Sequence, residues 1–598
     1  MRRLKSFALF VSNVVALVVL VGFAGAIAWG AWQVLPEGSR AAFRDPGSAV
    51  QGAQRGVRSG PSNPVTAAIE RVRDFFAEQR DRVDTVRAAD GSNGGIVPLP
   101  AWTSVDENRV FGATETLWQS RRGKLSGARW SRVVFAWSEV QPGGPRDWRA
   151  HYYLRDDIIR RERDTGIEVV GLLLATPAWA AARPQDGGRA VPAGLHRPVD
   201  DPQNLWAVFV RKMATEYRGR IDTWVIWNEP DIRPDGANAQ YFNWAGDERD
   251  YARMLTVASL AAKQGNPRAR IVFGATTYWS DQNAGRPLFL ERTLSILAED
   301  PDAAARGYYI DAVALNLYSS PDDLRRIAAI YRAVLDRFGS AAPLWLTETN
   351  ATPYDDPGRG LGREQNGFRV TMEEQSSYVV QAMALGLTAG YQRIAFHSLT
   401  DRDTGDELWG LVRNDGTMRP SFVAYQTATR YLSGAERVAF AGRERAAWPW
   451  PAGGYLPNWQ VYLVVVERGP GAPAPAPPEP VATPTPAPRF RLPWTGDPPP
   501  AQPRAEGRQR VSVLWNGDPT PVQVSLPRLA ERAILLDKYG RPQPLEPDGD
   551  RWRLTLAGAT AHSPLDPEGY YYVGGDPLFL VEDGVPEGAL VSSPDVLS

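Results

Sequence analysis

The sequence of 598 residues predicts an α/β protein: a (β/α)8 barrel of the TIM type, followed by a small antiparallel β-sandwich and preceded by a transmembrane helix. Three observations favour this organisation. Short β-rich runs alternate with longer helical segments over residues 105–432, the apolar runs over 433–583 are all strand-like, and residues 7–35 carry no charge. Alternating strands and helices are typical of a parallel sheet, and turn-separated strands are typical of a sandwich.

The N-terminal segment is long enough to cross a membrane. A spanning helix needs about 20 apolar residues, and the uncharged run 7–35 exceeds that length. Arg2, Arg3 and Lys5 precede the run, so the positive-inside rule predicts a cytoplasmic stub and single-pass anchor over residues 1–35, with the rest of the chain outside the cytoplasm. The alternative is a cleaved signal peptide and a secreted protein, although the apolar core of a signal peptide spans only about 7–15 residues.

Residues 36–104 are expected to form a spacer. Residues 36–62 are rich in Gly, Ser and Pro, whereas apolar residues recur at helical spacing over 64–88. We therefore expect an amphipathic helix over 64–88, interpreted first as a solvated stalk with one packed face; the alternatives are that it leans on the membrane, pairs with a partner or packs on the main domain. The sequence names no protein partner for it.

Eight apolar runs over residues 105–432 are the predicted barrel strands. The runs are continuous, as expected of strands that a parallel barrel buries on both faces. They lie at 110–114, 130–137, 167–175, 222–227, 270–276, 311–318, 343–348 and 391–396. Helices are expected between them at 153–166, 204–217, 250–265, 322–339 and 373–386. Barrels of this kind carry their active sites at the carboxyl ends of the strands.

The predicted sandwich covers residues 433–583 and is interrupted by a Pro-rich insertion at 469–508. Such a segment cannot build a core and is expected to be extended or disordered. Because it lies between two strand-like runs, we interpret it as a long loop within the sandwich. Residues 584–598 are expected to be a tail.

Composition excludes several classes of function. Lys and Arg number 67 and Asp and Glu number 68, so the basic excess of a nucleic-acid-binding protein is missing. The chain has no Cys and only four His, none of them at metal-ligand spacing. Disulfides, thiol catalysis, zinc sites and iron–sulfur clusters are therefore not expected, and neither a metal nor a cofactor is predicted.

Two glutamates follow predicted barrel strands directly. Glu229 ends the fourth strand in the run DTWVIWNEPD, and Glu348 ends the seventh in PLWLTETN. The ends of these strands lie on opposite sides of the barrel mouth, so the two carboxyl groups can face each other across one sugar ring. A facing pair at about 5–5.5 Å cleaves a glycosidic bond with retention of configuration. The charge of an ionised Glu348 would keep the nearby Glu229 neutral, so that Glu229 is the acid and Glu348 the nucleophile.

The motif WNEP at the fourth strand, together with TE at the seventh, resembles clan A of the retaining glycoside hydrolases. Family 39 and its relatives, including membrane-anchored members of exopolysaccharide systems, are the most similar. The resemblance implies that Glu229 is the acid/base and Glu348 the nucleophile, and that Asn228 binds the sugar 2-hydroxyl. It further implies that Tyr318 donates a hydrogen bond to the nucleophile and that Arg132 keeps the nucleophile ionised.

The chain departs from the family pattern at two strand ends. Many relatives carry His two positions before the tyrosine, where this chain has Asn316, and many end the eighth strand with Trp, where this chain has Phe396, His397 and Ser398. His397 is predicted either to contact substrate or to be structural. These departures bear on the sugar that is recognised and leave the carboxyl pair intact.

Aromatic side chains are expected at the mouth because sugar rings present apolar faces. Four tryptophans follow predicted strands and are candidates to stack on substrate: Trp137, Trp179, Trp279 and Trp409.

The sequence therefore predicts a membrane-anchored enzyme that hydrolyses a β-linked oligo- or polysaccharide outside the cytoplasm. Two alternatives remain open: a barrel that binds cell-surface glycan without catalysis, and a transglycosylase that uses the same carboxyl pair.

Overall fold

The computed structural model describes residues 103–104, 110–153, 156–235, 239–357, 369–401, 408–444, 459–469, 507–562 and 571–597. The predicted anchor at 7–35 and the predicted helix at 64–88 lie outside these residues. Within them, no helix is both long and apolar enough to cross a bilayer.

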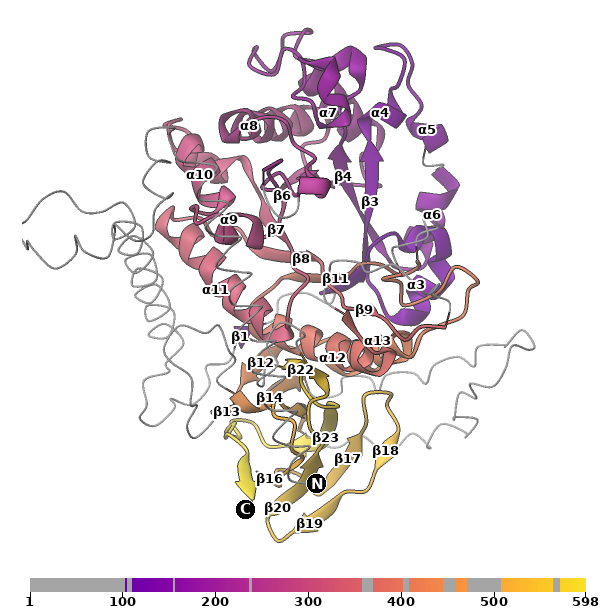
Figure 1. Cartoon of the computed structure of the whole chain (residues 1–598), viewed down its shortest axis with the longest axis vertical. Helices are drawn as coiled ribbons and strands as arrows, with labels where there is room; N and C mark the ends of the chain where they lie inside the picture. Colours follow the sequence, from indigo (N-terminus) through magenta and orange to yellow (C-terminus); the bar gives the residue numbers. More distant parts are fainter. Residues whose placement is uncertain are drawn as a thin grey trace, which may run out of the picture. The chain divides into compact units, whose positions relative to one another are not determined.

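Eight parallel strands form a closed barrel in the order β11–β2–β3–β4–β5–β6–β7–β8, which confirms the predicted barrel. The strands are β2 (Phe111–Ala113), β3 (Trp130–Ala136), β4 (Glu168–Leu174), β5 (Thr223–Asn228), β6 (Arg270–Thr276), β7 (Ala312–Asn316), β8 (Leu344–Glu348) and β11 (Arg393–Phe396). Figure 1 shows the helices around these strands, running from purple near β3 to salmon near β11. Each strand falls within one residue of a predicted apolar run or inside it, because burial on both faces removes polar residues from the strand.

The barrel interior is closed by large side chains at the amino ends of the strands. The rings of Trp130 and Trp345 lie 6.0 Å apart, and the guanidinium of Arg393 lies 4.3 Å from the Trp345 ring centre. Gly112 leaves room for this layer, because a Cβ atom there would lie 2.6 Å from the Trp130 ring. Arg393 also donates to Glu168 at 2.9 Å. This layer fills the barrel at the amino ends of the strands. It separates that end from the polar groups at the carboxyl ends, which form the mouth of the barrel.

Helices cover the outside of the barrel. The five predicted helical segments correspond to α6 (Asp156–Asp164), α7 (Leu205–Glu216), α8 (Glu248–Gly265), α11 (Pro321–Arg337) and α12 (Met372–Thr388). The other α-helices among the described residues are α3 (Ser120–Ser126), α4 (Trp137–Val140), α5 (Ala150–Tyr153), α9 (Trp279–Asn283), α10 (Phe289–Leu297) and α13 (Pro420–Leu432). Side-chain caps mark the starts of α7, α8, α11 and α12, and at α12 Thr371 and Glu374 form a reciprocal capping box.

Two antiparallel sheets follow the barrel. The larger has eight strands in the order β1–β12–β14–β15–β23–β17–β18 with β13 beside β14, and the smaller has the order β19–β20–β16–β24. The strands of the larger sheet are β1 (Thr103–Ser104), β12 (Arg437–Phe440), β13 (Arg443–Glu444), β14 (Trp459–Arg468), β15 (Arg508–Asn516), β17 (Arg532–Leu536), β18 (Pro542–Gln543) and β23 (Leu578–Val585). Those of the smaller sheet are β16 (Val522–Pro527), β19 (Glu546–Asp548), β20 (Arg551–Leu556) and β24 (Asp595–Leu597). Two short pairs complete the set: β9 (Thr352–Pro353) with β10 (Arg369–Val370), and β21 (Ala561–His562) with β22 (Tyr571–Val573).

The two sheets share one apolar core, as expected of a sandwich. Leu463 and Leu514 of the larger sheet pack in the same cluster as Leu526 and Trp552 of the smaller one. Alternate side chains of the larger sheet, such as Val464, belong instead to the core that includes the barrel helices. The larger sheet is therefore buried on both faces, with the smaller sheet on one side and the barrel on the other.

The ends of the sandwich differ from the sequence prediction. Residues 584–598, expected to be a tail, contribute β24, which pairs with β16. Residues 103–104, assigned to the spacer, form β1 and pair with β12. Both are short strands whose pairing partners are distant in the sequence. The Pro-rich insertion joins β14 to β15, which pair with each other, and residues 470–506 of it lie outside the described residues.

A buried lysine joins the larger sheet to α12. Lys538 is 2% exposed, and its Nζ donates to the Glu373 carbonyl at 2.9 Å and to Asp576 at 2.7 Å. Gln381 of α12 donates to the carbonyl of Gly575 at 2.9 Å. The sheet domain is therefore held to α12 by polar as well as apolar contacts.

Candidate active site

Glu229 and Glu348 both lie at the mouth of the barrel. Glu348 is the last residue of β8 and Glu229 directly follows β5, the seventh and fourth barrel strands. Because all eight strands are parallel, their carboxyl ends share one end of the barrel. The predicted strand positions of the two glutamates are confirmed.

At the end of β5 an irregular backbone turns the side chains of Asn228 and Glu229 toward the same atom, Nδ2 of Asn316. Trp227 and Glu229 have left-handed φ values of 69° and 49°. Asn228 Oδ1 and Glu229 Oε1 both accept from Asn316 Nδ2, at 3.2 and 2.8 Å. A regular strand would send neighbouring side chains to opposite faces. The left-handed residues break this alternation at the end of β5.

The strained turn is held in place by its surroundings. Such conformations cost about 1–3 kcal/mol each and persist only where other contacts enforce them. The indole Nε1 of Trp227 donates to the carbonyl and side-chain oxygens of Asn243, at 3.0 and 3.1 Å, and the amide of Glu229 donates to the Ala275 carbonyl at 2.7 Å. These contacts come from the loop before α8 and from β6, so the position of Glu229 depends on both.

Glu348 is surrounded by groups that stabilise a carboxylate. Arg132, from β3, forms a buried ion pair with Oε1 of Glu348, and the Tyr318 hydroxyl donates to Oε2 at 2.6 Å. Burial alone raises the pKa of Glu348. The charge of Arg132 outweighs it, together with His397 and the Tyr318 hydrogen bond, and lowers the pKa to about 2. Glu348 is therefore ionised over the ordinary pH range.

Glu229 has the opposite environment. Burial, followed by the negative charge of Glu348, raises the pKa of Glu229 to about 8, although the hydrogen bond from Asn316 acts in the other direction. Asn316 is neutral, so it orients the carboxyl group without forcing ionisation. The Glu229 carboxyl consequently keeps its proton at neutral pH.

Hydrogen bonds connect the surroundings of the two carboxyl groups. Arg132 donates to Asn228 at 3.4 Å as well as pairing with Glu348. Thr347 donates to Asn316 Oδ1 at 2.9 Å, so the amide of Asn316 must turn its Nδ2 toward Glu229. Of the predicted site residues, the structure thus brings together five: Arg132, Asn228, Glu229, Tyr318 and Glu348.

His397 and Trp409 lie on the Glu348 side of this cluster. The Trp409 ring centre lies 4.9 Å from that of Tyr318, and the His397 ring 6.4 Å from it. His397 is largely buried and shares a hydrogen bond of 3.1 Å with Thr114. Trp409 is partly exposed. Of the four tryptophans predicted to stack on a sugar, it is the one that contacts Tyr318.

The other three tryptophans are placed differently. Trp137 is fully buried and stacks on Phe209 at 4.6 Å, so its prediction as a sugar platform is corrected to a core position. Trp179 is partly exposed and donates to the Gln141 carbonyl at 2.7 Å. Trp279 is partly exposed beside Tyr278, with ring centres 5.0 Å apart. Within the described residues, neither the Trp179 bond to Gln141 nor the Trp279 contact with Tyr278 reaches the two glutamates.

Asn316 and Asp231 add to the site beyond the residues predicted for it. Asn316 stood out in the sequence only as a departure from a family pattern, yet it bonds both Asn228 and Glu229. Asp231 is buried two residues after Glu229, and its Oδ2 accepts from the amide and hydroxyl of Thr277, at 2.9 and 2.7 Å. It therefore fastens the Glu229 loop to the residue after β6. Burial and the charge of Asp281 raise the pKa of Asp231 to about 7.

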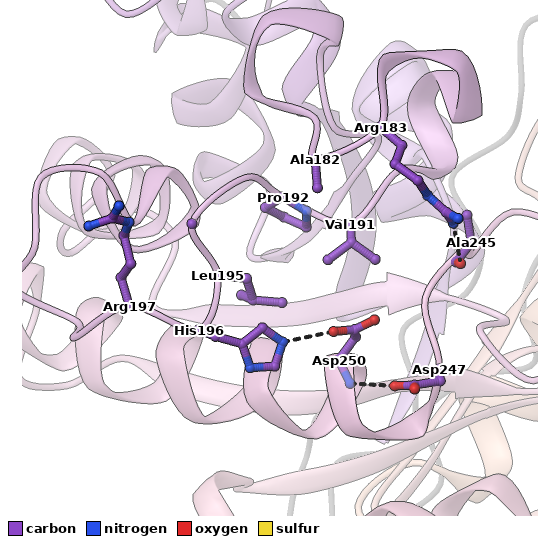
Figure 2. Close-up of a pocket in the computed structure, with 11 residues that line it drawn as sticks. Ala182, Arg183, Val191, Pro192, Leu195, His196, Arg197, Ala245, Asp247 and Asp250 are labelled. Atoms are coloured by element: carbon purple, nitrogen blue, oxygen red, sulfur yellow. Dashed lines mark hydrogen bonds and ion pairs between the residues drawn. The ribbon is translucent and has the colours of Figure 1, made fainter.

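A separate open hollow of about 820 Å³ lies between the loops that follow β4 and β5. Figure 2 shows His196 bonded to Asp250 and Arg183 bonded to the Ala245 carbonyl in its wall, at 2.8 and 3.3 Å. Arg197, at its rim, pairs with Asp201. None of the predicted site residues lines this hollow.

No protein-family model matches the chain, and no curated protein matches its sequence. Solved structures that are similar to it include glycoside hydrolases of families 39, 30 and 51. A family 39 glycoside hydrolase from the gut symbiont Bacteroides cellulosilyticus WH2 has a TM-score of 0.51 and 15% identity, over 80% of this chain and 82% of that chain. A family 30 subfamily 8 xylanase from Clostridium acetobutylicum has a TM-score of 0.45 and 13% identity, over 81% and 97%. A family 51 α-L-arabinofuranosidase from Bifidobacterium longum has a TM-score of 0.45 and 13% identity, over 80% and 99%. The likeness of fold to the family 39 structure agrees with the resemblance drawn from the WNEP and TE motifs.

Proposed function

We propose that this chain is a retaining glycoside hydrolase that cleaves O-glycosidic bonds in a β-linked glycan. The observation that carries the proposal is the unequal environment of two carboxyl groups at one barrel mouth. Glu348 is paired with Arg132 and Tyr318, whereas Glu229 is held by the neutral Asn316. The neighbours of Glu348 lower its pKa and the surroundings of Glu229 raise its pKa. Such a difference assigns the ionised carboxyl as the nucleophile and the protonated one as the acid.

In the first step the Glu348 carboxylate attacks the anomeric carbon and the glycosidic bond breaks. Glu229 donates its proton to the departing oxygen, so the leaving group departs as an alcohol and Glu229 becomes ionised. The Glu348 oxygen that attacks is then part of an ester, and its negative charge has gone. The pKa of Glu229 falls for that reason, because the charge of Glu348 was one cause of its elevation.

In the second step Glu229 takes a proton from water as the water oxygen attacks the anomeric carbon. The bond to Glu348 breaks, Glu348 leaves as a carboxylate, and both groups return to their starting states. Arg132 and Tyr318 stabilise the carboxylate that is released, and Asn228, beside Glu229, is the residue we propose to bind the sugar 2-hydroxyl. A sugar acceptor in place of water would give transglycosylation by the same two steps.

The test compares Glu348→Gln and Glu229→Gln on aryl β-glycosides with good and poor leaving groups. We expect Glu348→Gln to abolish turnover on both. Glu229→Gln should retain more activity on the good leaving group, which departs without a proton. Glu168→Gln is a matched control, because Glu168 also pairs with an arginine but at the amino end of a barrel strand.

Full activity of both variants refutes the two-glutamate mechanism. Glycan binding without release of reducing ends, in the unaltered protein, favours the non-catalytic alternative. Longer oligosaccharides at high substrate concentration favour transglycosylation over hydrolysis.

We also propose that residues 7–35 anchor the enzyme in a membrane with the barrel outside the cytoplasm. The support is the uncharged length of the segment and the three basic residues before it. The full chain should remain in the membrane fraction after carbonate extraction, and a chain lacking residues 1–35 should not. If the full chain is expressed and a product that lacks the N-terminal segment is recovered from the medium, signal cleavage would be supported instead.

A further inference from the structure

Asn350, two residues beyond Glu348, joins three segments of the barrel mouth. The residue is 0% exposed. Its Nδ2 donates to the carbonyls of His397 and Trp409, at 2.8 and 2.7 Å. Its Oδ1 accepts from the Ala351 amide at 2.9 Å and from Gln375 Nε2 at 3.3 Å. Both N–H groups and the oxygen of the amide are thus used, which fixes the orientation of the side chain.

The segment that carries Trp409 has its own contacts with the end of β11. The amide of Leu411 donates to the Ser398 carbonyl at 3.1 Å, and that of Val412 donates to the Leu399 carbonyl at 2.9 Å. These bonds hold the segment to residues 398–399 but not to the strand of Glu348. The bond from Asn350 to the Trp409 carbonyl links this segment to the chain just after the strand of Glu348.

A closed circuit of contacts results. Glu348 accepts from Tyr318, the Tyr318 ring lies against Trp409, and the Trp409 carbonyl accepts from Asn350, which follows Glu348 in the chain. We call Tyr318 and Trp409 the aromatic wall. A sugar ring that reaches Glu348 must lie beside this wall, because Tyr318 is bonded to the carboxylate itself.

We propose that Asn350 is a positioning residue, which sets the aromatic wall relative to the Glu348 carboxylate through the carbonyls of Trp409 and His397. The inference deepens the proposed function and rests on it, because the wall matters for turnover only if Glu348 is the nucleophile. Asn350 itself does not touch the substrate in this proposal. Gln375 of α12 supports it by bonding Asn350 and the Ala351 carbonyl, the latter at 2.9 Å.

The variant Asn350→Asp tests the role of the two N–H groups. Aspartate has nearly the same shape, but it replaces the two donors with an acceptor that faces two carbonyl oxygens. A buried acceptor left without its donor is destabilised, and the two carbonyls lose their hydrogen bonds. We expect kcat/KM on an aryl β-glycoside to fall roughly ten-fold or more, with most of the loss in KM, where the wall contributes to sugar binding.

Asn516→Asp is the matched control. Asn516 is also fully buried, and its side chain donates to the Thr520 carbonyl at 2.7 Å and accepts from the Asp518 amide at 2.9 Å. It lies in β15, in the sandwich. We expect it to lower the melting temperature without changing KM. A loss of kcat/KM in this control equal to that in Asn350→Asp would overturn the inference.

A double-mutant cycle with Trp409→Ala separates positioning from loss of stability. If Asn350 acts through the wall, the second substitution costs little once the first is present, and the two effects are non-additive. Additive effects overturn the inference. If Asn350→Asp does not fold, Asn350→Ser takes its place in the same cycle, because serine keeps a donor for one carbonyl.

Hydrogen exchange of the full chain tests the contact without any turnover. In Asn350→Asp the amides of residues 408–412 should exchange faster while those of β3 and β4 stay protected. Unchanged exchange over 408–412 overturns the inference. If the wild-type protein is inactive on every glycoside, yet Asn350→Asp speeds exchange over residues 408–412, the proposed function is refuted and the contact is not.

Discussion

Replacing Arg132 with methionine should move the acidic side of the pH–activity profile. Arg132 is 4% exposed and is the main cause of the low pKa of Glu348, which lies near 2 instead of the ordinary 4.5. At about 1.36 kcal/mol for each pKa unit, this difference amounts to roughly 3 kcal/mol in favour of the ionised carboxylate. Methionine replaces the unbranched aliphatic part of the arginine side chain and removes the charge.

Burial then becomes the dominant influence on Glu348 and acts to raise its pKa. Turnover needs the ionised nucleophile, so activity is lost as the pH falls through this pKa. In the unaltered enzyme kcat/KM should stay level on the acidic side down to about pH 4, whereas in Arg132→Met it should already decline near or above pH 4.5. The assay is the initial rate on an activated aryl β-glycoside across this range.

Stability must be measured alongside, because removing one partner of a buried ion pair can cost about 3–5 kcal/mol. Arg393→Met is the matched control, since Arg393 is buried in β11 and pairs with Glu168 at the amino end of the barrel. It should lower the melting temperature and leave the acidic limb in place. An acidic limb of Arg132→Met that coincides with that of the unaltered enzyme would refute the assignment of Arg132.

Four further outcomes are expected. Tyr318→Phe removes a hydrogen bond to the charged Glu348, so kcat/KM should fall about ten-fold or more with little change in melting temperature, and an unchanged kcat/KM would count against the assignment. Trp137→Ala should lower the free energy of unfolding by about 3–5 kcal/mol in denaturant titrations without raising KM, because the ring is fully buried against Phe209. Lys538→Met should lower the free energy of unfolding by about 1–3 kcal/mol and leave the pH profile as it was, since its contacts join the sandwich to α12. Above about pH 8 kcat/KM should decline because Glu229 loses its proton, and in Glu229→Gln this alkaline limb should be absent.

The barrel was predictable because its strands carry the signal in their own composition. The run 270–276 coincides with β6, and the run 343–348 contains β8, since burial on both faces leaves few polar residues in either strand. The strand β24 has only three residues and depends on β16, which lies far away in the sequence. No local pattern distinguishes such a strand from a tail.

The site was predictable where a residue type and its place at a strand end coincide. Glu229 and Glu348 met both conditions. The burial of Trp137 depends on Phe209 from another helix, and the left-handed backbone of Trp227 depends on Asn243, sixteen residues later in the loop before α8. Those contacts are made only once the chain has folded, so the sequence near either tryptophan gives no sign of them.

The proposed roles of the two glutamates, Glu229 as acid and Glu348 as nucleophile, follow from the residues around them, because the two side chains are chemically the same. The end of β7 supplies a neighbour to each: Asn316 donates to Glu229, and Tyr318, two residues later, donates to Glu348. Arg132, from β3, then forms its ion pair with Glu348, and its charge is only the last of the influences on the pKa of Glu229. An arginine at position 316 would extend that charge to Glu229, lower its pKa and ionise both carboxyl groups. No proton would then be held for the departing sugar, so the neutrality of Asn316 is as necessary to the proposed chemistry as the charge of Arg132.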